Sequence, residues 1–454
     1  MINSIRKEMA KLFKDNPYVL NLYLNDYNKL LLIYDYSMID TIRLQRDIIP
    51  ILIKENYSSI IANLVKINKE DIVKNVFNAC VIIYDYKDKE FYSLELNNVP
   101  TRSVSESSVD ITISGPKDSL IESLDRNIAL IQKRVKTKDL IIKDYYLGEL
   151  TKTKVCLLYL NNNKTTNIAN TINNKLKQAK IDSLTNIGQL ESLLVNKKAL
   201  VPLFSYTARC DFISESLIAN RVIIIIDGIP LALVAPSTFF FFLEYHDSLS
   251  ENFFVMLFDR ILFLIALFLA LLLSPFVLAV TNYYPELLSL DLISTTINSR
   301  KGISFTFTSE TIIAEIFLQL FRIAGTRLPK GLDSSLLVVG SFLIGTVIID
   351  AGILSQEALF IAATSVITSY VISNNSSFNT SINLFRYFLL FLTVRFGFVG
   401  MSIGIIMILV YLASNYSMGV PYLSPVSPFN FKEFIKSLIP QNILKKGDKV
   451  NEEN

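Results

Sequence analysis

The sequence predicts a mixed α/β region of two subdomains followed by an α-helical membrane domain. The first observation is charge: the last 204 of 454 residues hold only 26 of the 85 Asp, Glu, Lys and Arg residues, and most of the long apolar runs. The second is pattern: the first 245 residues alternate apolar, β-branched runs with helical patterns, which is typical of an α/β region. An ordinary soluble globular protein is therefore excluded.

Length and composition together predict four segments. At about 150 residues per domain, the chain has room for about three domains. We expect a cytosolic α/β subdomain at 1–150, a second at 151–250, a helical membrane domain at 251–415 and a cytoplasmic tail at 416–454. The division between the two subdomains is placed near Thr151.

Apolar runs predict the strands of the first region, and amphipathic stretches predict its helices. The runs are Leu30–Tyr34, Val81–Tyr84, Val109–Ile113, Val155–Tyr159 and Val222–Ile226, and the helical patterns are Leu120–Val135 and Ile168–Lys180. No G-x-G-x-x-G or Walker-type loop follows any of these runs, so nucleotide binding has no support.

The stretch Val222–Leu243 is apolar enough to suggest a membrane span, and its only charge is Asp227. We interpret it instead as a buried β-hairpin, because Asp227-Gly228 supplies the positive φ angles that a short turn needs.

Four later segments are predicted to cross the membrane. They are Ile261–Val280, Leu336–Leu354, Ala358–Ser373 and Leu384–Ala413. The last would be about 45 Å long as one helix, against a hydrocarbon layer of about 30 Å. It is therefore either strongly tilted or broken near Gly397 and Gly400. Gly400 and Gly404 also form a G-x-x-x-G face on which another helix can pack closely.

An amphipathic helix is predicted at 309–324, between the first two spans. Its apolar face holds Ile312, Ile313, Ile316, Phe317, Leu320 and Phe321, and its polar face holds Glu310, Glu315, Gln319 and Arg322. Such a helix is too charged to span alone, so it either lies in the interface or lines a bundle.

The ends of the chain predict which side of the membrane each segment occupies. Residues 1–21 lack the apolar core of a secretory signal, so the first region is expected in the cytoplasm. The tail after Tyr422 is rich in lysine, which favours a cytoplasmic C-terminus, and four spans satisfy both ends. This topology places five basic residues in the outer loop, against the positive-inside tendency; they are Arg300, Lys301, Arg322, Arg327 and Lys330.

Composition also excludes several functional classes. A net charge of +3 with both signs interspersed leaves no basic stripe for nucleic acid. The single histidine, His246, and three distant cysteines, Cys80, Cys156 and Cys210, supply no metal cluster, disulfide framework or catalytic triad. We therefore predict no metal, no cofactor and no enzymatic activity.

Ordered blocks of residues after about position 100 resemble the GerA family of spore germination receptors, specifically the A subunit. The blocks are Gly115-Pro116 with Asn127-Ile128, Leu130-Ile131 and Arg134; Gly148 with Thr151-Lys152-Thr153; Arg221-Val222 to Pro230 with Pro236, Thr238 and Phe239; Arg300, Glu310, Glu315, Arg322 and Ala324-Gly325; Arg327-Leu328-Pro329; and Gly419 to Pro425. The chain departs from the family pattern at Ser107, Asn220, Tyr284, Gln319 and Ile323.

The resemblance implies a multi-pass subunit of a nutrient receptor in the inner membrane of a dormant spore. It implies a transporter-like B subunit and a lipoprotein C subunit as partners. It also implies a homo-oligomer that forms a cation channel opened by a germinant.

Charged residues in or beside the apolar segments are the candidate pore or coupling residues, because a charge in the membrane costs about 2.5–3.5 kcal/mol unless it faces an interior, water or a partner. The candidates are Arg260, Glu310, Glu315, Asp350, Arg386 and Arg395.

Each candidate also has a simpler interpretation. Asp350 and the pair Asp259-Arg260 suit interfacial anchors, and Arg386 suits a side chain that extends to the headgroups. Arg395 lies deeper and either pairs with an acid or lines a pore. Glu310 and Glu315 form either rings of carboxylates around an axis or a solvated polar face. A non-conducting scaffold is the second hypothesis for the whole chain, and a membrane enzyme is the third.

Overall fold

The computed structural model describes residues 2–13, 16–24, 30–53, 64–96, 118–195, 199–243, 253–325, 345–373, 375–431 and 434. The chain divides into two compact units. The N-terminal unit comprises Met1–Lys198, Leu203–Ser237 and Ser417–Gly419, and the helical unit comprises Ala199–Pro202, Thr238–Tyr416 and Val420–Asn454.

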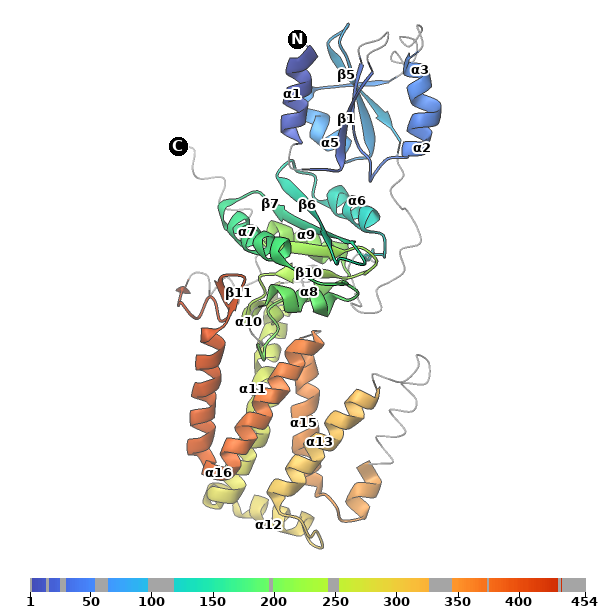
Figure 1. Cartoon of the computed structure of the whole chain (residues 1–454). Coiled ribbons are helices and arrows are strands. Elements are labelled where there is room, and N and C mark those ends of the chain that lie inside the picture. Colours follow the sequence, from blue (N-terminus) through green and yellow to red (C-terminus); the bar gives the residue numbers. More distant parts are fainter. Residues whose placement is uncertain are drawn as a thin grey trace. The chain divides into compact units, whose positions relative to one another are not determined.

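The first subdomain of the N-terminal unit is an antiparallel sheet in the order β1-β2-β4-β5-β3. Its strands are β1 (Val19–Leu24), β2 (Leu30–Asp35), β3 (Val65–Ile67), β4 (Cys80–Asp85) and β5 (Glu90–Glu95). Figure 1 shows α1 (Ile2–Leu12) and α5 (Ile72–Val76) on one side of the sheet and α2 (Thr41–Arg43) and α3 (Ile49–Ile53) on the other. The central strands β2 and β4 are buried along their whole length because helices cover both faces.

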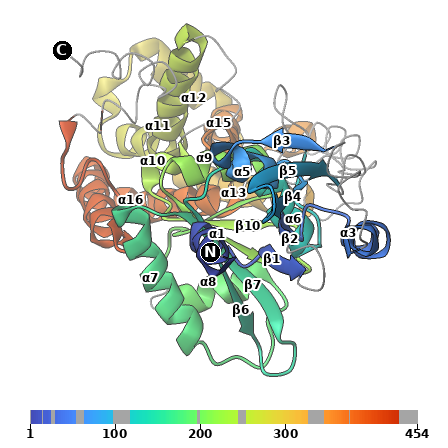
Figure 2. The same cartoon turned by 90° about the horizontal axis from the view of Figure 1, so that it is seen from above.

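The second subdomain is an antiparallel sheet in the order β6-β7-β9-β10-β8. Its strands are β6 (Leu140–Leu147), β7 (Thr153–Leu160), β8 (Ser205–Thr207), β9 (Val222–Ile226) and β10 (Ala232–Ala235). Four helices surround it (Figure 2): α6 (Leu124–Arg134), α7 (Asn163–Gln178), α8 (Ile187–Leu194) and α9 (Cys210–Ile218). Every residue of β9 is 0% exposed, so this sheet too is covered on both faces.

The two subdomains repeat one topology. Numbered within its own subdomain, each sheet has the strand order 1-2-4-5-3. In each, helices connect the second strand to the third and the third strand to the fourth: α2 and α3, then α5, in the first subdomain, and α7 and α8, then α9, in the second. The N-terminal unit is therefore built from two copies of the same arrangement.

The predicted mixture of strands and helices is confirmed. Four of the five predicted strands correspond to β2, β4, β7 and β9, and the fifth, Val109–Ile113, lies outside the described residues. β9 and β10 form the expected buried hairpin, with Gly228 at φ +82° in the connecting loop. The sequence predicts the boundary between the two subdomains near Thr151, but β6 and β7, on either side of that position, pair within one sheet. The two sheets are instead separated by the segment between Leu96 and Asp118.

Several residues of the family-like blocks hold the second subdomain together. Asn127 is 0% exposed and binds both the backbone nitrogen and the carbonyl of Ile121. Asp227 accepts a hydrogen bond from the nitrogen of Leu124 at the start of α6. Gly148 has φ +90°, and a side chain there would collide with the Thr151 hydroxyl, so the turn between β6 and β7 requires glycine.

The helical unit contains α11 (Phe253–Tyr283), α12 (Leu290–Ser299), α13 (Phe307–Gly325), α15 (Gln356–Val371) and α16 (Ser376–Ser414). A shared apolar cluster joins α11, α13, α15 and α16 and contains Leu278, Phe307, Ala358, Ile361 and Leu390. Two helices in the described residues are long and apolar enough to cross a membrane, at Leu257–Tyr283 and Ser376–Ser414. Residues 336–344 of the span predicted at Leu336–Leu354 lie outside the described residues, and the rest is described from residue 345 onward.

The long helix α16 is a hairpin of two arms. Gly397, at φ 60° and ψ −140°, interrupts it, and Figure 1 shows the chain reversing there. A side chain at Gly400 would collide with the carbonyl of Leu392, and one at Gly404 would lie 2.6 Å from Leu389, so the arms run antiparallel and touch. Of the two alternatives for this segment, strong tilt or a break near Gly397 and Gly400, the structure shows the break, and the partner that packs on Gly400 and Gly404 is the first arm of the same helix.

A short strap, Ala199–Pro202, lies against both arms of α16. The backbone nitrogen of Leu200 donates to the Tyr411 hydroxyl over 2.7 Å, and the Ser381 hydroxyl donates to the Leu200 carbonyl over 2.6 Å. The start of the first arm and the end of the second arm therefore lie at the same end of the helical unit. Beyond the second arm come the short strands β11 (Tyr416–Ser417) and β12 (Val420–Pro421).

Candidate site of buried charges in the helical unit

The helix α13 turns its carboxylates inward and much of its apolar side outward. Glu310 and Glu315 are both 0% exposed, whereas Ile316 is 49% and Leu320 59% exposed. In water an amphipathic helix buries the apolar face instead. The reversed arrangement suits a surrounding of acyl chains, where ionised groups are stable only inside the protein.

Glu310 connects the residue that follows α12 to the residue that precedes α15. One carboxylate oxygen lies 3.0 Å from Nε of Arg300, which follows α12, and the other accepts a hydrogen bond from the backbone nitrogen of Ser355 over 2.9 Å. Ser355 in turn caps the start of α15 through its hydroxyl. Glu310 is therefore not on a solvated face.

Arg386 connects all four long helices of the bundle. From α16 its Nε lies 3.1 Å from the Glu315 carboxylate on α13, and its Nη1 donates to the carbonyls of Ala270 on α11 and Ser365 on α15. Its side chain is 0% exposed. The expectation that Arg386 extends to the headgroups is wrong, because a carboxylate and two carbonyls inside the bundle satisfy most of its donors.

The other candidates lie apart from this centre. Asp350 and Arg395 are exposed and form no ion pair within the described part of the chain. Arg260 is half-buried near the start of α11. The structure thus brings Glu315 and Arg386 into contact and places Glu310 in a second buried pair, whereas Asp350 and Arg395 belong to neither pair.

A buried ion pair links two helices, and substitution of only one of its two partners destabilises the protein. Removing one member leaves an uncompensated charge, at a cost of about 3–5 kcal/mol. The second carboxylate oxygen of Glu315 and the second terminal nitrogen of Arg386 lack partners among the described residues. The pair therefore has donor and acceptor capacity left for a different arrangement of the helices.

The sequence did not identify Arg300 as a site residue, although it stands in a family-like block. No local signal reveals it, because ten residues and a loop separate Arg300 from Glu310. In the described residues no group of three or more His, Cys, Asp or Glu side chains is placed to hold a metal ion.

A second charged cluster joins the two subdomains of the N-terminal unit. Lys154 on β7 lies 3.2 Å from Asp144 and 3.3 Å from Asp125, and donates to the hydroxyl of Tyr18 over 3.0 Å. Burial alone lowers the pKa of Lys154, but the two carboxylates outweigh it and raise that pKa. Burial raises the pKa of the Tyr18 hydroxyl, so both groups keep their protons near neutral pH. Sequence reasoning missed this cluster because its members are distant in the chain.

Comparison with known proteins places this architecture in a family. The model of a family described as Bacillus/Clostridium GerA spore germination protein matches residues 4–450. Spore germination protein XA of Bacillus anthracis is 30% identical over 440 residues, covering 92% of this chain and 89% of that protein. GerIA of Bacillus cereus is 32% identical over 324 residues, covering 71% and 48%.

A solved structure is also similar in part. It is the N-terminal domain of the A subunit of the Bacillus megaterium spore germinant receptor GerK3, at 20% identity and a TM-score of 0.40. The match covers 53% of this chain and 96% of that one.

Proposed function

This chain belongs to the family of Bacillus/Clostridium GerA spore germination proteins, and from this premise we propose that it is an A-type subunit of a germinant receptor whose helical unit forms a germinant-gated cation channel. Membership of the family supports a role in spore germination. Gating by a germinant, conduction and oligomerisation are the proposed steps.

The inverted helix α13 is the observation that carries the proposal. Its carboxylates are buried against arginines while its apolar side chains face outward, as expected for a bundle surrounded by lipid. Arg386 contacts all four long helices, so a change in their arrangement changes its contacts. A ligand that binds a second arrangement more tightly shifts the equilibrium toward it, and the size of the shift is set by the difference between its affinities for the two arrangements.

The exposed side chains of Asp350 and Arg395 are the proposed lining of the ion passage. Asp350 and Arg395 lie on apolar segments, are exposed on the single chain and form no ion pair within the described ranges. In a homo-oligomer such groups face either a neighbouring subunit or an aqueous axis, and rings of carboxylates favour cations. Glu310, Glu315 and Arg386 then act as coupling residues, and Arg260 lies near the entry to α11.

The proposed location is the inner membrane of the spore, with several spans, the N-terminal unit in the cytoplasm, residues 251–415 in the membrane and residues 416–454 as a cytoplasmic tail. The strap supports an even number of crossings, because Leu200 contacts both ends of α16. The proposed partners are a transporter-like B subunit and a lipoprotein C subunit. Relatives named spore germination proteins A1 and B1 support a complex of several chains.

A flux assay tests the channel. The receptor subunits are reconstituted together in liposomes loaded with potassium, and efflux is measured after germinant is added. We expect germinant-dependent efflux that Asp350→Asn slows or makes less selective, while Asp291→Asn, on the exposed helix α12, leaves it unchanged. Absence of flux under conditions where the complex binds germinant would remove the channel from the proposal.

A non-conducting scaffold is the alternative, and one observation favours it. Both carboxylates of α13 already have arginine partners within the single chain, so neither is free to face a pore. If neutralising Asp350 and Arg395 together leaves assembly, ion selectivity and germination unchanged, these residues line no passage and the scaffold is favoured.

A further inference from the structure

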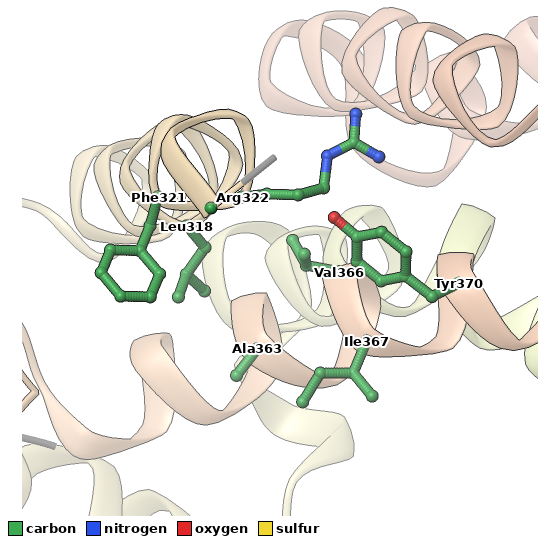
Figure 3. A pocket seen from close by; sticks show the side chains of 8 residues that line it. Leu318, Phe321, Arg322, Ala363, Val366, Ile367 and Tyr370 are labelled. Carbon is green, nitrogen blue, oxygen red and sulfur yellow. The ribbon is translucent and has the colours of Figure 1, made fainter. Parts of the chain in front are cut away.

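An open pocket of about 410 Å³ lies between α13 and α15. Figure 3 shows its apolar lining, which includes Leu318, Phe321, Ala363, Val366 and Ile367, and the long side chain of Arg322 extending from α13 toward Tyr370. Ile367 is 62% and Tyr370 40% exposed, so the pocket opens on the outside of the bundle.

Arg322 is the charged residue named in this lining, and no carboxylate of the described residues neutralises it. The carboxylates of α13 belong to other arginines: Glu310 to Arg300 and Glu315 to Arg386. Across the described ranges, the guanidinium of Arg322 has no carboxylate partner; it lies 5.2 Å from the centre of the Tyr370 ring. An aromatic face attracts a cation but does not compensate its charge.

The pocket therefore combines an apolar slot with a single cation at its edge. An acyl chain fits the first feature, and a phosphate fits the second, since a guanidinium binds phosphate through two parallel hydrogen bonds. The surroundings of the pocket are apolar as well: Leu320 is 59% and Phe360 70% exposed on the same two helices. Basic pockets between membrane helices are recurrent sites for anionic lipids.

We propose that this pocket binds one anionic phospholipid, with its phosphate on Arg322 and part of an acyl chain against Leu318, Ala363 and Val366. The site is independent of the proposed channel, because it requires only that the helical unit lie in a bilayer. In this proposal a bound lipid becomes a structural part of the contact between α13 and α15. The Glu315–Arg386 pair lies beside that contact.

Native mass spectrometry of the full chain in non-ionic detergent tests the proposal. The chain is titrated with phosphatidylglycerol or with phosphatidylcholine of the same acyl chains. We expect retention of one phosphatidylglycerol at a concentration about tenfold lower than for phosphatidylcholine, the equivalent of one charge-assisted contact. Arg322→Gln should abolish this preference, and Arg322→Lys should keep much of it.

Two further variants distinguish the contribution of the apolar pocket from that of the Arg322 charge. Ala363→Phe fills the slot and keeps Arg322, so it should also reduce retention of phosphatidylglycerol. Lys301→Gln removes an exposed cation from the loop after α12 and should not change the retention of phosphatidylglycerol. Inorganic phosphate at the same concentration should not displace the lipid.

Three results would overturn the proposal. The first is a preference for phosphatidylglycerol that survives both Arg322→Gln and Ala363→Phe. The second is displacement by inorganic phosphate alone, which would indicate a simple anion site. The third is loss of self-association in Arg322→Gln with lipid retention unchanged, which would assign the guanidinium to a carboxylate of a second copy.

Discussion

At the scale of single residues, the helical unit is organised by where its charges are buried. Among the described residues of this unit, the side chains of Glu310, Glu315 and Arg386 are fully buried, and each contacts a group on another element. The sequence predicts that such charges face an interior, because a lipid-facing charge is costly. It does not predict their partners, because pairing depends on helix packing and not on spacing along the chain.

The pair of Glu315 and Arg386 predicts a non-additive effect of mutation. Arg386→Met leaves a buried carboxylate without its partner and should destabilise the helical unit by about 3–5 kcal/mol. Adding Glu315→Leu removes that charge and should restore most of the loss. Thermal unfolding of the four chains of this double-mutant cycle in detergent measures the coupling. Additive losses would show that the pair is not a unit.

A half-buried carboxylate in the N-terminal unit predicts a pH dependence. Burial raises the pKa of Glu191 from 4.5 to about 7, and the Tyr206 hydroxyl donates to its carboxylate. Between these two pH values the folded chain holds a proton that the unfolded chain has released, so stability falls as pH rises from about 4.5 to 7. Glu191→Gln removes the titration and should flatten this slope.

The apparent Tm of the N-terminal unit, measured in the full chain from pH 5 to pH 8, checks this prediction. The variant should be the more stable protein by a few degrees at pH 8, where the wild type must bury a charge. Equal slopes for the two proteins would contradict it.

At the scale of elements, α13 and α16 show what a sequence pattern leaves open. The periodicity of α13 correctly indicates two faces, and the glycines of α16 correctly indicate a break. Which face of α13 is buried does not follow from the pattern, since the answer depends on the solvent around the helix. The division near Thr151 fails for a related reason: a β-hairpin turn and a link between domains have similar composition.

The reversal of α16 predicts a specific role for Gly397. Its backbone angles are those that only glycine adopts easily, and a side chain would lie 3.0 Å from the ring of Tyr283, whose hydroxyl binds the Val394 carbonyl. Gly397→Ala should cost about 1–3 kcal/mol. Gly345→Ala is the matched control, because its φ is not positive and an added Cβ would meet no atom of the described residues within 4 Å beyond its own neighbours in the helix. Thermal unfolding in detergent should separate the two, and equal stability would contradict the assigned strain.

The hairpin also predicts the sidedness of the membrane domain. Single cysteines replacing Phe396 and Lys301, both exposed, should react with an impermeant maleimide from one side, and a cysteine replacing Tyr416 from the other. Native Cys80, Cys156 and Cys210 are buried, so the background should be low. Labelling of position 301 only from the cytosol would overturn the outer-loop assignment of residues 281–331. Lys330, another residue expected in the outer loop, lies outside the described residues.

At the scale of the whole molecule, family, fold class and division into two units follow from the sequence, and the repeated topology does not. The two subdomains share their strand order but differ in helix lengths and in local sequence, so no period in the sequence reveals the repeat. Each sheet buries its central strands by itself, and polar contacts such as those of Lys154 join the two subdomains.

The junction predicts how the N-terminal unit unfolds. Lys154→Met removes a cation that Asp125, Asp144 and Tyr18 share, at an expected cost of about 1.5–3 kcal/mol, and should split one calorimetric transition into two. Lys66→Met removes an exposed pair with Glu90 and should change little. A single unchanged transition in Lys154→Met would show that the subdomains are joined by other contacts.

The strap at Ala199–Pro202 has a mechanical consequence. Residues on both sides of the strap, up to Lys198 and from Leu203, belong to the N-terminal unit. Within the strap, Leu200 forms hydrogen bonds with both arms of α16, through Tyr411 and Ser381. Tension applied to this short loop is delivered to two antiparallel helices at once, at the mouth of the hairpin and far from its pivot at Gly397.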